Sequence, residues 1–111
     1  MKKLAKLILF ICVVLTVSSC GMDNLPQGEF LTSAEAPNGL HRIDAYLCNG
    51  GATVDFAVRC AVVDIDSGEE RNIYWQYHQQ TAQIEWIDEE TVEINGIRLN
   101  IFTDSYDWRK L

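Results

Sequence analysis

The stretch that decides the fold runs from Arg42 to Tyr77 and reads RIDAYLCNGGATVDFAVRCAVVDIDSGEERNIYWQY. Asn49-Gly50 is a strong signal for a tight hairpin, because a type I′ turn needs positive φ at both central residues. Asp66-Ser67-Gly68-Glu69 is a second turn signal. Between the turns, apolar residues recur at every second position, which predicts a middle strand with an antiparallel partner on each side.

The two turns also predict how the three strands are aligned. With Asn49-Gly50 at the first tip, Ile43 lies opposite Phe56. With Ser67-Gly68 at the second tip, Cys60 lies opposite Trp75. The middle strand then points one set of alternate side chains toward a core, namely Val54, Phe56, Val58, Cys60 and Val62.

The remaining chain repeats these strand signals. Residues 29–32 form a candidate short first strand, and alternating apolar residues predict strands around 84–86 and 92–94. Asn95-Gly96 is another type I′ signal, and it places Glu93 opposite Arg98 as a favourable charge pair. We expect about six strands in one small all-β domain, an antiparallel meander that forms a sandwich or a partly open barrel, with the three tryptophans and most phenylalanines in its core.

The N-terminus has the pattern of an export signal. Three lysines (Lys2, Lys3 and Lys6) precede an apolar run over residues 7–17. This run is shorter than the roughly 20 residues that span a bilayer, as is usual for a secretory signal. The run ends in Val17-Ser18-Ser19-Cys20-Gly21, which resembles the bacterial lipobox. The resemblance implies a signal peptide over 1–19 and a diacylglyceryl group on Cys20; the alternatives are an ordinary signal peptide or an uncleaved anchor. The following Gly, Pro, Asp and Asn residues show no periodicity and predict a tether over 20–28, and the strand signals predict a single domain over 29–111.

Removal of residues 1–19 would make the protein strongly acidic. It takes away three lysines and no acidic residue, leaving six basic against sixteen acidic residues, a net charge of −10. Such a chain is unsuited to nucleic acid and is repelled by anionic headgroups, so the acyl anchor would have to hold it at the membrane. The acidity either serves solubility or indicates a basic partner or metal ions.

The predicted alignment gathers polar residues on the face opposite the core. Asp44 would lie directly opposite Asp55, a destabilising juxtaposition of like charges unless other groups compensate. The candidate polar binding face consists of Arg42, Asp44, Asp55, Arg59, Tyr74 and His78. It is interpreted either as a solvated face whose arginines neutralise the two carboxylates, or as a shallow site for a polar ligand, a cation or a protein.

Other candidate chemistry is sparse. The predicted first hairpin separates Cys48 from Cys60 by nearly 30 Å at about 3.3 Å per residue, so we expect no disulfide. No histidine is placed beside either cysteine, and we expect no catalytic residue, no metal site and no cofactor. The acidic run 64–70 resembles the start of a calcium loop, but a plain β-turn accounts for it.

Several segments together resemble an uncharacterised family of small lipoproteins from Gram-positive bacilli. They are Ala36-Pro37-Asn38-Gly39, AYLCNGGATVDFAVR (45–59), NIYWQYH (72–78) and IEWIDEETVEINGIRL (84–99). The resemblance covers roughly residues 36–108. It implies an extracytoplasmic lipoprotein and supplies no activity, ligand or catalytic residue. The family pattern has glycine where this chain has Cys60.

These observations favour a non-enzymatic binding module, anchored by lipid to the outer face of the cell membrane, with a protein or cell-wall partner. Two alternatives stay open. One is a structural or accessory envelope protein. The other is an immunity-type protein that masks a basic secreted toxin, for which a charge of −10 is suited.

Overall fold

The computed structural model describes residues 25–49 and 55–110. This part of the chain is built from strands, which confirms the all-β prediction. It has eight strands, two more than the expected six. The strands are β1 (Glu29–Glu35), β2 (His41–Asn49), β3 (Phe56–Asp64), β4 (Glu70–Tyr77), β5 (Ile84–Trp86), β6 (Thr91–Ile94), β7 (Ile97–Asn100) and β8 (Tyr106–Asp107), followed by a 3₁₀ turn, η1 (Trp108–Lys110).

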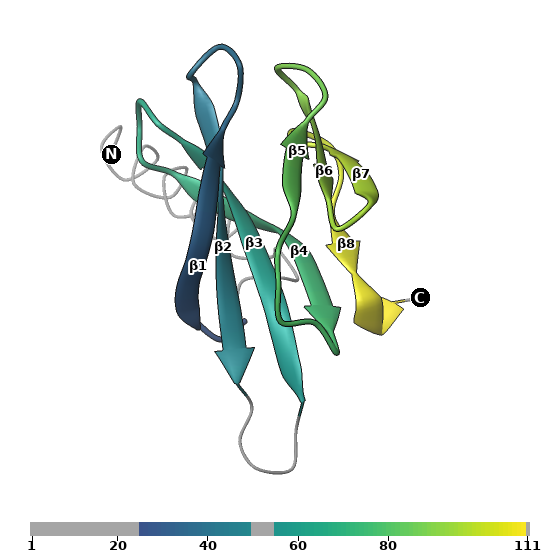
Figure 1. Cartoon of the computed structure of the whole chain (residues 1–111). Coiled ribbons are helices and arrows are strands. Elements are labelled where there is room, and N and C mark those ends of the chain that lie inside the picture. Colours follow the sequence, from purple (N-terminus) through teal and green to yellow (C-terminus); the bar gives the residue numbers. More distant parts are fainter. Residues whose placement is uncertain (1–24, 50–54, 111) are drawn as a thin grey trace, which may run out of the picture.

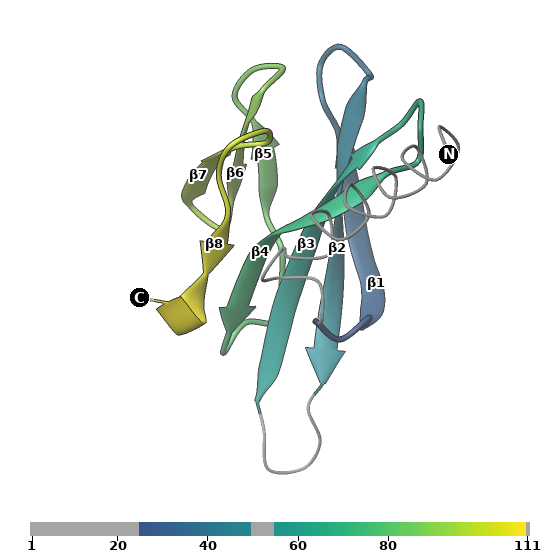
Figure 2. The same ribbon diagram turned by 180° about the vertical axis from the view of Figure 1, so that it is seen from behind.

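The strands form two sheets that face each other (Figure 1). The larger sheet has the order β1-β2-β3-β4-β8, and β8 runs parallel to β4. The smaller sheet has the order β5-β6-β7. Figure 2 shows the larger sheet from behind. Neither sheet closes into a barrel within the described residues.

The hydrophobic core lies between the two sheets. Its members are fully or nearly fully buried: Ile43, Ala45, Val58, Cys60, Val62, Ile73, Tyr74, Val92, Ile94, Leu99 and Ile101. Trp86 packs against this core, and its indole N–H donates a hydrogen bond of 3.0 Å to the carbonyl of Ala34. This bond joins the smaller sheet to β1, the edge strand of the larger one.

The predicted meander of β2, β3 and β4 is confirmed, but the predicted alignment of β2 with β3 is wrong by six residues. Ile43 lies opposite Val62 rather than Phe56, and the pairing ends at Asn49 and Phe56. The predicted tip at Asn49-Gly50 therefore does not close the hairpin as a two-residue turn. Because six is an even number, the shift leaves the described side chains of β2 and β3 on their predicted faces, whereas Val54 lies outside the described residues. The observed alignment pairs apolar residues on the core face, namely Ile43 with Val62, Ala45 with Cys60 and Leu47 with Val58.

The alignment of β3 with β4 differs from the prediction because of a longer turn and a β-bulge. Asp64 and Glu69 close a longer turn than predicted, and Val62 lies opposite Arg71. Between Tyr74 and Asn72 the alignment shifts by one residue at Ile73. An extra residue reverses the faces of all that follow it. Tyr74 therefore points into the core, whereas the predicted core residue Trp75 lies on the outer face.

The Asn95-Gly96 turn forms as predicted. Asn95 and Gly96 have φ values of 48° and 85°. Ile94 lies opposite Ile97, and Arg98 forms an ion pair of 3.1 Å with Glu93. Here the turn residues and the alternating apolar residues lie within a few positions of each other, so no distant segment favours another alignment.

The aromatic core is smaller than expected. Phe30 and Phe102 are 61% and 56% exposed, and none of the three tryptophans is fully buried. The predicted signal peptide and the lipid attachment at Cys20 lie outside the described residues. Among the residues that the structure does describe, no helix is long and apolar enough to cross a membrane.

Candidate functional site

The larger sheet has an outer face, turned away from the core, and the sequence placed the candidate site there. The structure separates its two carboxylates. Asp44 lies opposite Ala61 in β3, and Asp55 precedes β3 altogether. The predicted juxtaposition of Asp44 with Asp55 is therefore wrong, and the six-residue shift in alignment is the reason.

Asp44 is held by its own neighbours. Its side chain accepts a hydrogen bond of 2.8 Å from the hydroxyl of Ser33 and one of 3.0 Å from Nε of Arg42. Asp44 is buried, and a buried carboxylate needs such partners. The hydrogen bonds within this cluster already occupy the carboxylate of Asp44, which leaves little of its hydrogen-bonding capacity for a ligand.

Arg59 fastens the N-terminal segment to the outer face. Its guanidinium donates a hydrogen bond of 2.7 Å to Asn72 Oδ1 and one of 2.8 Å to the carbonyl of Gln27. It also stacks on Tyr46, 4.2 Å from the centre of the ring. Arg59 is only 4% exposed. The thiol of Cys48 adds a contact of 3.6 Å to the carbonyl of Pro26. Residues 25–28 therefore lie across part of the face that the sequence proposed for binding.

Tyr74 does not belong to the polar face. The bulge at Ile73 points it into the core, where it is fully buried and stacks on Tyr106 with ring centres 5.4 Å apart. Its hydroxyl donates a hydrogen bond of 2.6 Å to Gln79. Burial raises the pKa of this hydroxyl above its ordinary value. Its assignment to the candidate site was wrong.

Asp55 and His78 do meet, where β3 begins and β4 ends. Nδ1 of His78 lies 2.6 Å from Oδ2 of Asp55, and the backbone N–H of Asp55 donates to the hydroxyl of Tyr77. The hydrogen bond with His78 lowers the pKa of Asp55. His78 has a φ of 60°, which is unusual for a residue other than glycine. Within the described part, no serine or cysteine is hydrogen-bonded to either side chain.

A small pocket lies beside this pair. It has a volume of about 180 Å³ and is lined mainly by apolar atoms of Pro26, Cys48, Ala57, Trp75 and Tyr77. Burial raises the pKa of the Cys48 thiol, which disfavours the thiolate needed for nucleophilic attack. Cys60 lies on the opposite face, where burial raises the pKa of its thiol to about 12.

Cys48 and Cys60 lie closer together in the sheet than the predicted alignment of β2 with β3 indicated. Cys48 lies opposite Ala57, only three residues from Cys60, so the predicted separation of nearly 30 Å is wrong. Their side chains point to opposite faces of the sheet, which keeps the sulfurs apart, and both thiols are free.

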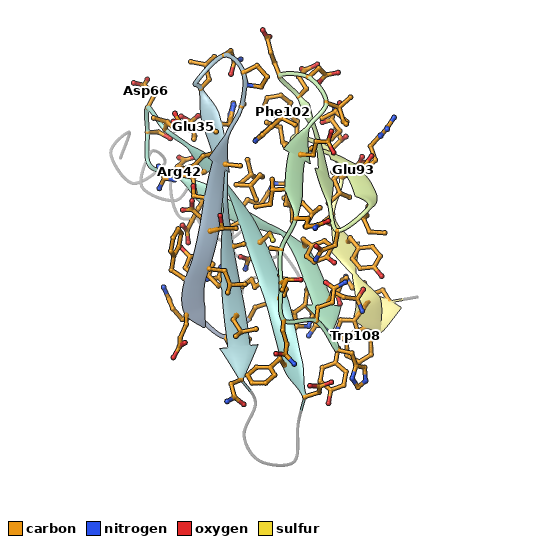
Figure 3. The ribbon with its side chains drawn as sticks, viewed as in Figure 1. Glu35, Arg42, Asp66, Glu93, Phe102 and Trp108 are labelled. Carbon is orange, nitrogen blue, oxygen red and sulfur yellow. The ribbon has the colours of Figure 1, made fainter. Side chains whose placement is uncertain are left out.

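A second pocket, which the sequence reading missed, lies at the opposite end of the molecule. It has a volume of about 250 Å³ and is lined by His41, Val62, Asp64, Glu69, Glu70, Arg71, Ile101 and Phe102. The rings of His41 and Phe102 pack edge to face with centres 5.4 Å apart. Arg71 donates hydrogen bonds to the carbonyls of Ile101 and Asp104, so it supports the loop that carries Phe102. Figure 3 shows Phe102 and Asp66 toward this end and Trp108 toward the other.

The missed pocket combines three segments of the chain, around His41, from Val62 to Arg71, and at Ile101 and Phe102. Its sequence signal was the acidic run 64–70, which was interpreted as a turn. That interpretation is confirmed, since Asp64 Oδ1 accepts hydrogen bonds from the backbone of Asp66 and Ser67. In the part of the chain that the structure describes, no three His, Cys, Asp or Glu side chains are grouped to hold a metal ion.

Comparison with known proteins adds a family but no activity. No curated protein and no solved structure matches this chain. The sequence does match a family of unknown function, DUF5412, over residues 2–111, which includes both the N-terminal stretch and the β domain. The chain therefore belongs to the DUF5412 family.

Proposed function

We propose that this protein is a lipoprotein, anchored through Cys20 to the extracytoplasmic face of the cell membrane, and that it acts as a non-enzymatic interaction module. The lipobox-like sequence ending at Cys20 supports the anchor. Two acyl chains hold a protein stably, whereas one chain binds reversibly. The Asp55–His78 pair is exposed, and no serine or cysteine of the described residues is hydrogen-bonded to it, which supports binding rather than catalysis.

The attachment of residues 25–28 supports a close coupling between anchor and domain. Leu25 lies five positions after Cys20, and an extended chain covers at most about 3.6 Å per residue, or roughly 18 Å. The outer face of the larger sheet, where these residues lie, would then be the part nearest the bilayer. A partner would have to bind elsewhere on the molecule.

The observation that carries the binding role is the end of the molecule that holds the larger of the two pockets described above. We call it the loop end and define it as segments 36–41, 64–71, 87–90 and 101–105. It carries four of the five large apolar side chains that are exposed in the described residues: Leu40, Ile65, Ile87 and Phe102. Clustered exposed apolar groups beside a pocket are typical of interaction surfaces.

The location is tested by the N-terminus of the mature protein. In a Gram-positive host, mass spectrometry should find a mature chain that begins with a diacylglyceryl-modified Cys20, and external protease should reach it on cells stripped of wall. The Cys20→Ala variant should lose the modification and leave the membrane fraction. A mature chain that begins elsewhere, or one protected from external protease, would reject the proposed location.

The interaction role is tested by cross-linking on intact cells. Photoreactive p-benzoylphenylalanine is placed at Phe102 in the loop end or, as the matched control, at the equally exposed Phe30 at the other end. A discrete adduct from Phe102 alone is expected. The same adducts from both positions, or none from either, would contradict binding through the loop end.

A further inference from the structure

The loop end has an uneven charge as well as apolar side chains. It holds eight carboxylates against one guanidinium, that of Arg71, for a net charge of −7. The carboxylates are half of all those in the chain: Asp64, Asp66, Glu69, Glu70, Asp88, Glu89, Glu90 and Asp104.

None of these eight carboxylates is neutralised by an ion pair within the described residues. The four ion pairs there all lie elsewhere: Arg42–Asp44, Asp55–His78, Glu93–Arg98 and Asp107–Arg109. Arg71 donates to two backbone carbonyls rather than to a carboxylate. The negative potential of the loop end is thus left for a partner, and such potentials select partners of opposite charge.

The four loops form one continuous surface. The N–H of Ile65 donates to the carbonyl of Leu40, the ring of His41 packs on Phe102, and the N–H of Ile101 donates to the carbonyl of Glu90. Of the four exposed apolar side chains, Phe102 lines the pocket, and the carboxylates of Asp64, Glu69 and Glu70 line it as well. The loop end thus presents apolar side chains and carboxylates on one surface, as protein interfaces do.

We infer that the loop end binds a basic peptide segment, with an apolar side chain seated against Phe102 and the pocket, and with lysines or arginines facing the surrounding carboxylates. This inference rests on the proposed function and names its partner. The pocket volume of about 250 Å³ falls below the usual range for drug-sized ligands and is suited to one or two side chains. Anionic lipid and nucleic acid are repelled by the same charge.

The experiment uses the full-length protein in nanodiscs of zwitterionic lipid, with empty nanodiscs as the blank. The probes are fluorescein-labelled nonapeptides of alternating lysine and leucine, or of alternating glutamate and leucine, and binding is measured by anisotropy. Only the lysine peptide should bind, and its affinity should fall as NaCl rises from about 0.05 M to about 0.5 M.

Two matched pairs of variants locate the site. Glu69→Gln/Glu70→Gln should weaken binding roughly three- to tenfold at low salt. Glu29→Gln/Glu85→Gln removes the same charge from exposed residues outside the loop end and should leave binding unchanged. Phe102→Ala should weaken binding by about tenfold, whereas Phe30→Ala should not. Circular dichroism confirms that each variant is folded.

Equal weakening by the two charge variants would overturn the inference, because total acidity rather than the loop end would then attract the peptide. Binding of the glutamate peptide, or of neither peptide, would overturn it as well. If the Phe102 cross-link on cells still forms in that case, the interaction role stands and only the basic partner is rejected. If the cross-link also fails, the proposed function is rejected.

Discussion

Arg59 and Cys60 are adjacent in β3 and show how one residue step decides a side chain's role. Cys60 points into the core and is fully buried among apolar groups. Arg59 points to the outer face, where it holds residues 25–28. Alternation along the strand predicted these opposite faces. It did not predict that the charged residue would be as deeply buried as the apolar one, because the covering segment lies more than 30 residues away.

Arg59→Ala should lower the free energy of unfolding by about 2–4 kcal/mol, since it removes charge-assisted hydrogen bonds from a buried position. Hydrogen exchange should also become faster at residues 25–28, which lose the bond to Gln27. Arg42→Ala, which removes a more exposed arginine from the same face, is the control. Unchanged exchange in the Arg59 variant would show that other contacts hold the segment.

Asp107 gives a pH-dependent contribution to stability. It is buried, and a hydrogen bond of 2.6 Å from Arg109 lowers its pKa. A carboxyl whose pKa is lower in the folded state stabilises the fold above its unfolded pKa of about 3.9, and this is lost as pH falls through the folded value. Asp107→Asn should therefore cost about 1–3 kcal/mol at pH 7 and progressively less below about pH 4. Urea unfolding of the native protein and the variant at pH 7 and below about pH 4 measures this cost. The same cost at both pH values would refute the prediction.

At the scale of elements, the two long hairpins and the short one behave differently. In the short β6–β7 hairpin, turn and pattern specify the same alignment, and the prediction was confirmed. In the longer hairpins, two alignments agree equally well with the alternation of apolar side chains, so the prediction depended on the turn residues alone. No turn residue marks the bulge at Ile73 in the sequence, and the bulge reversed the predicted faces of Tyr74 and Trp75.

Gly96 tests the conformational requirement of the short turn. A Cβ at this position would meet no atom within 4 Å, so only the φ of 85° opposes a side chain. Gly96→Ala should therefore destabilise the protein by about 1–2 kcal/mol in urea unfolding. Gly96→Asn should recover most of the loss, because asparagine tolerates this region. Equal stability of the alanine variant and the native protein would contradict the turn assignment.

At the scale of the whole molecule, two sheets enclose one core and leave two surfaces of different character. The outer face of the larger sheet holds the chain's own residues 25–28. The loop end collects half of the carboxylates and most of the exposed apolar side chains. This division, rather than any single residue, is the basis of the proposed binding role.

The hydrogen bond from Trp86 to Ala34 joins the two sheets directly. Trp86→Phe keeps an aromatic ring against the core but removes the donor, and it should cost about 0.5–1.5 kcal/mol. Native-state hydrogen exchange should become faster in β1 and β5 more than in β3. Uniform acceleration across both sheets would instead mean that they open only together.

The sequence by itself determined the all-β class, the β2–β3–β4 meander, the faces of β2 and β3 and the whole β6–β7 hairpin. It could do so because side-chain alternation and type I′ turns are local properties of the chain. Tertiary structure alone decided the six-residue alignment, the bulge, the burial of Arg59 and the loop-end pocket. These features depend on which apolar pairs and which distant segments pack best together. An alternating pattern alone does not decide this, because several strand alignments agree with it equally well.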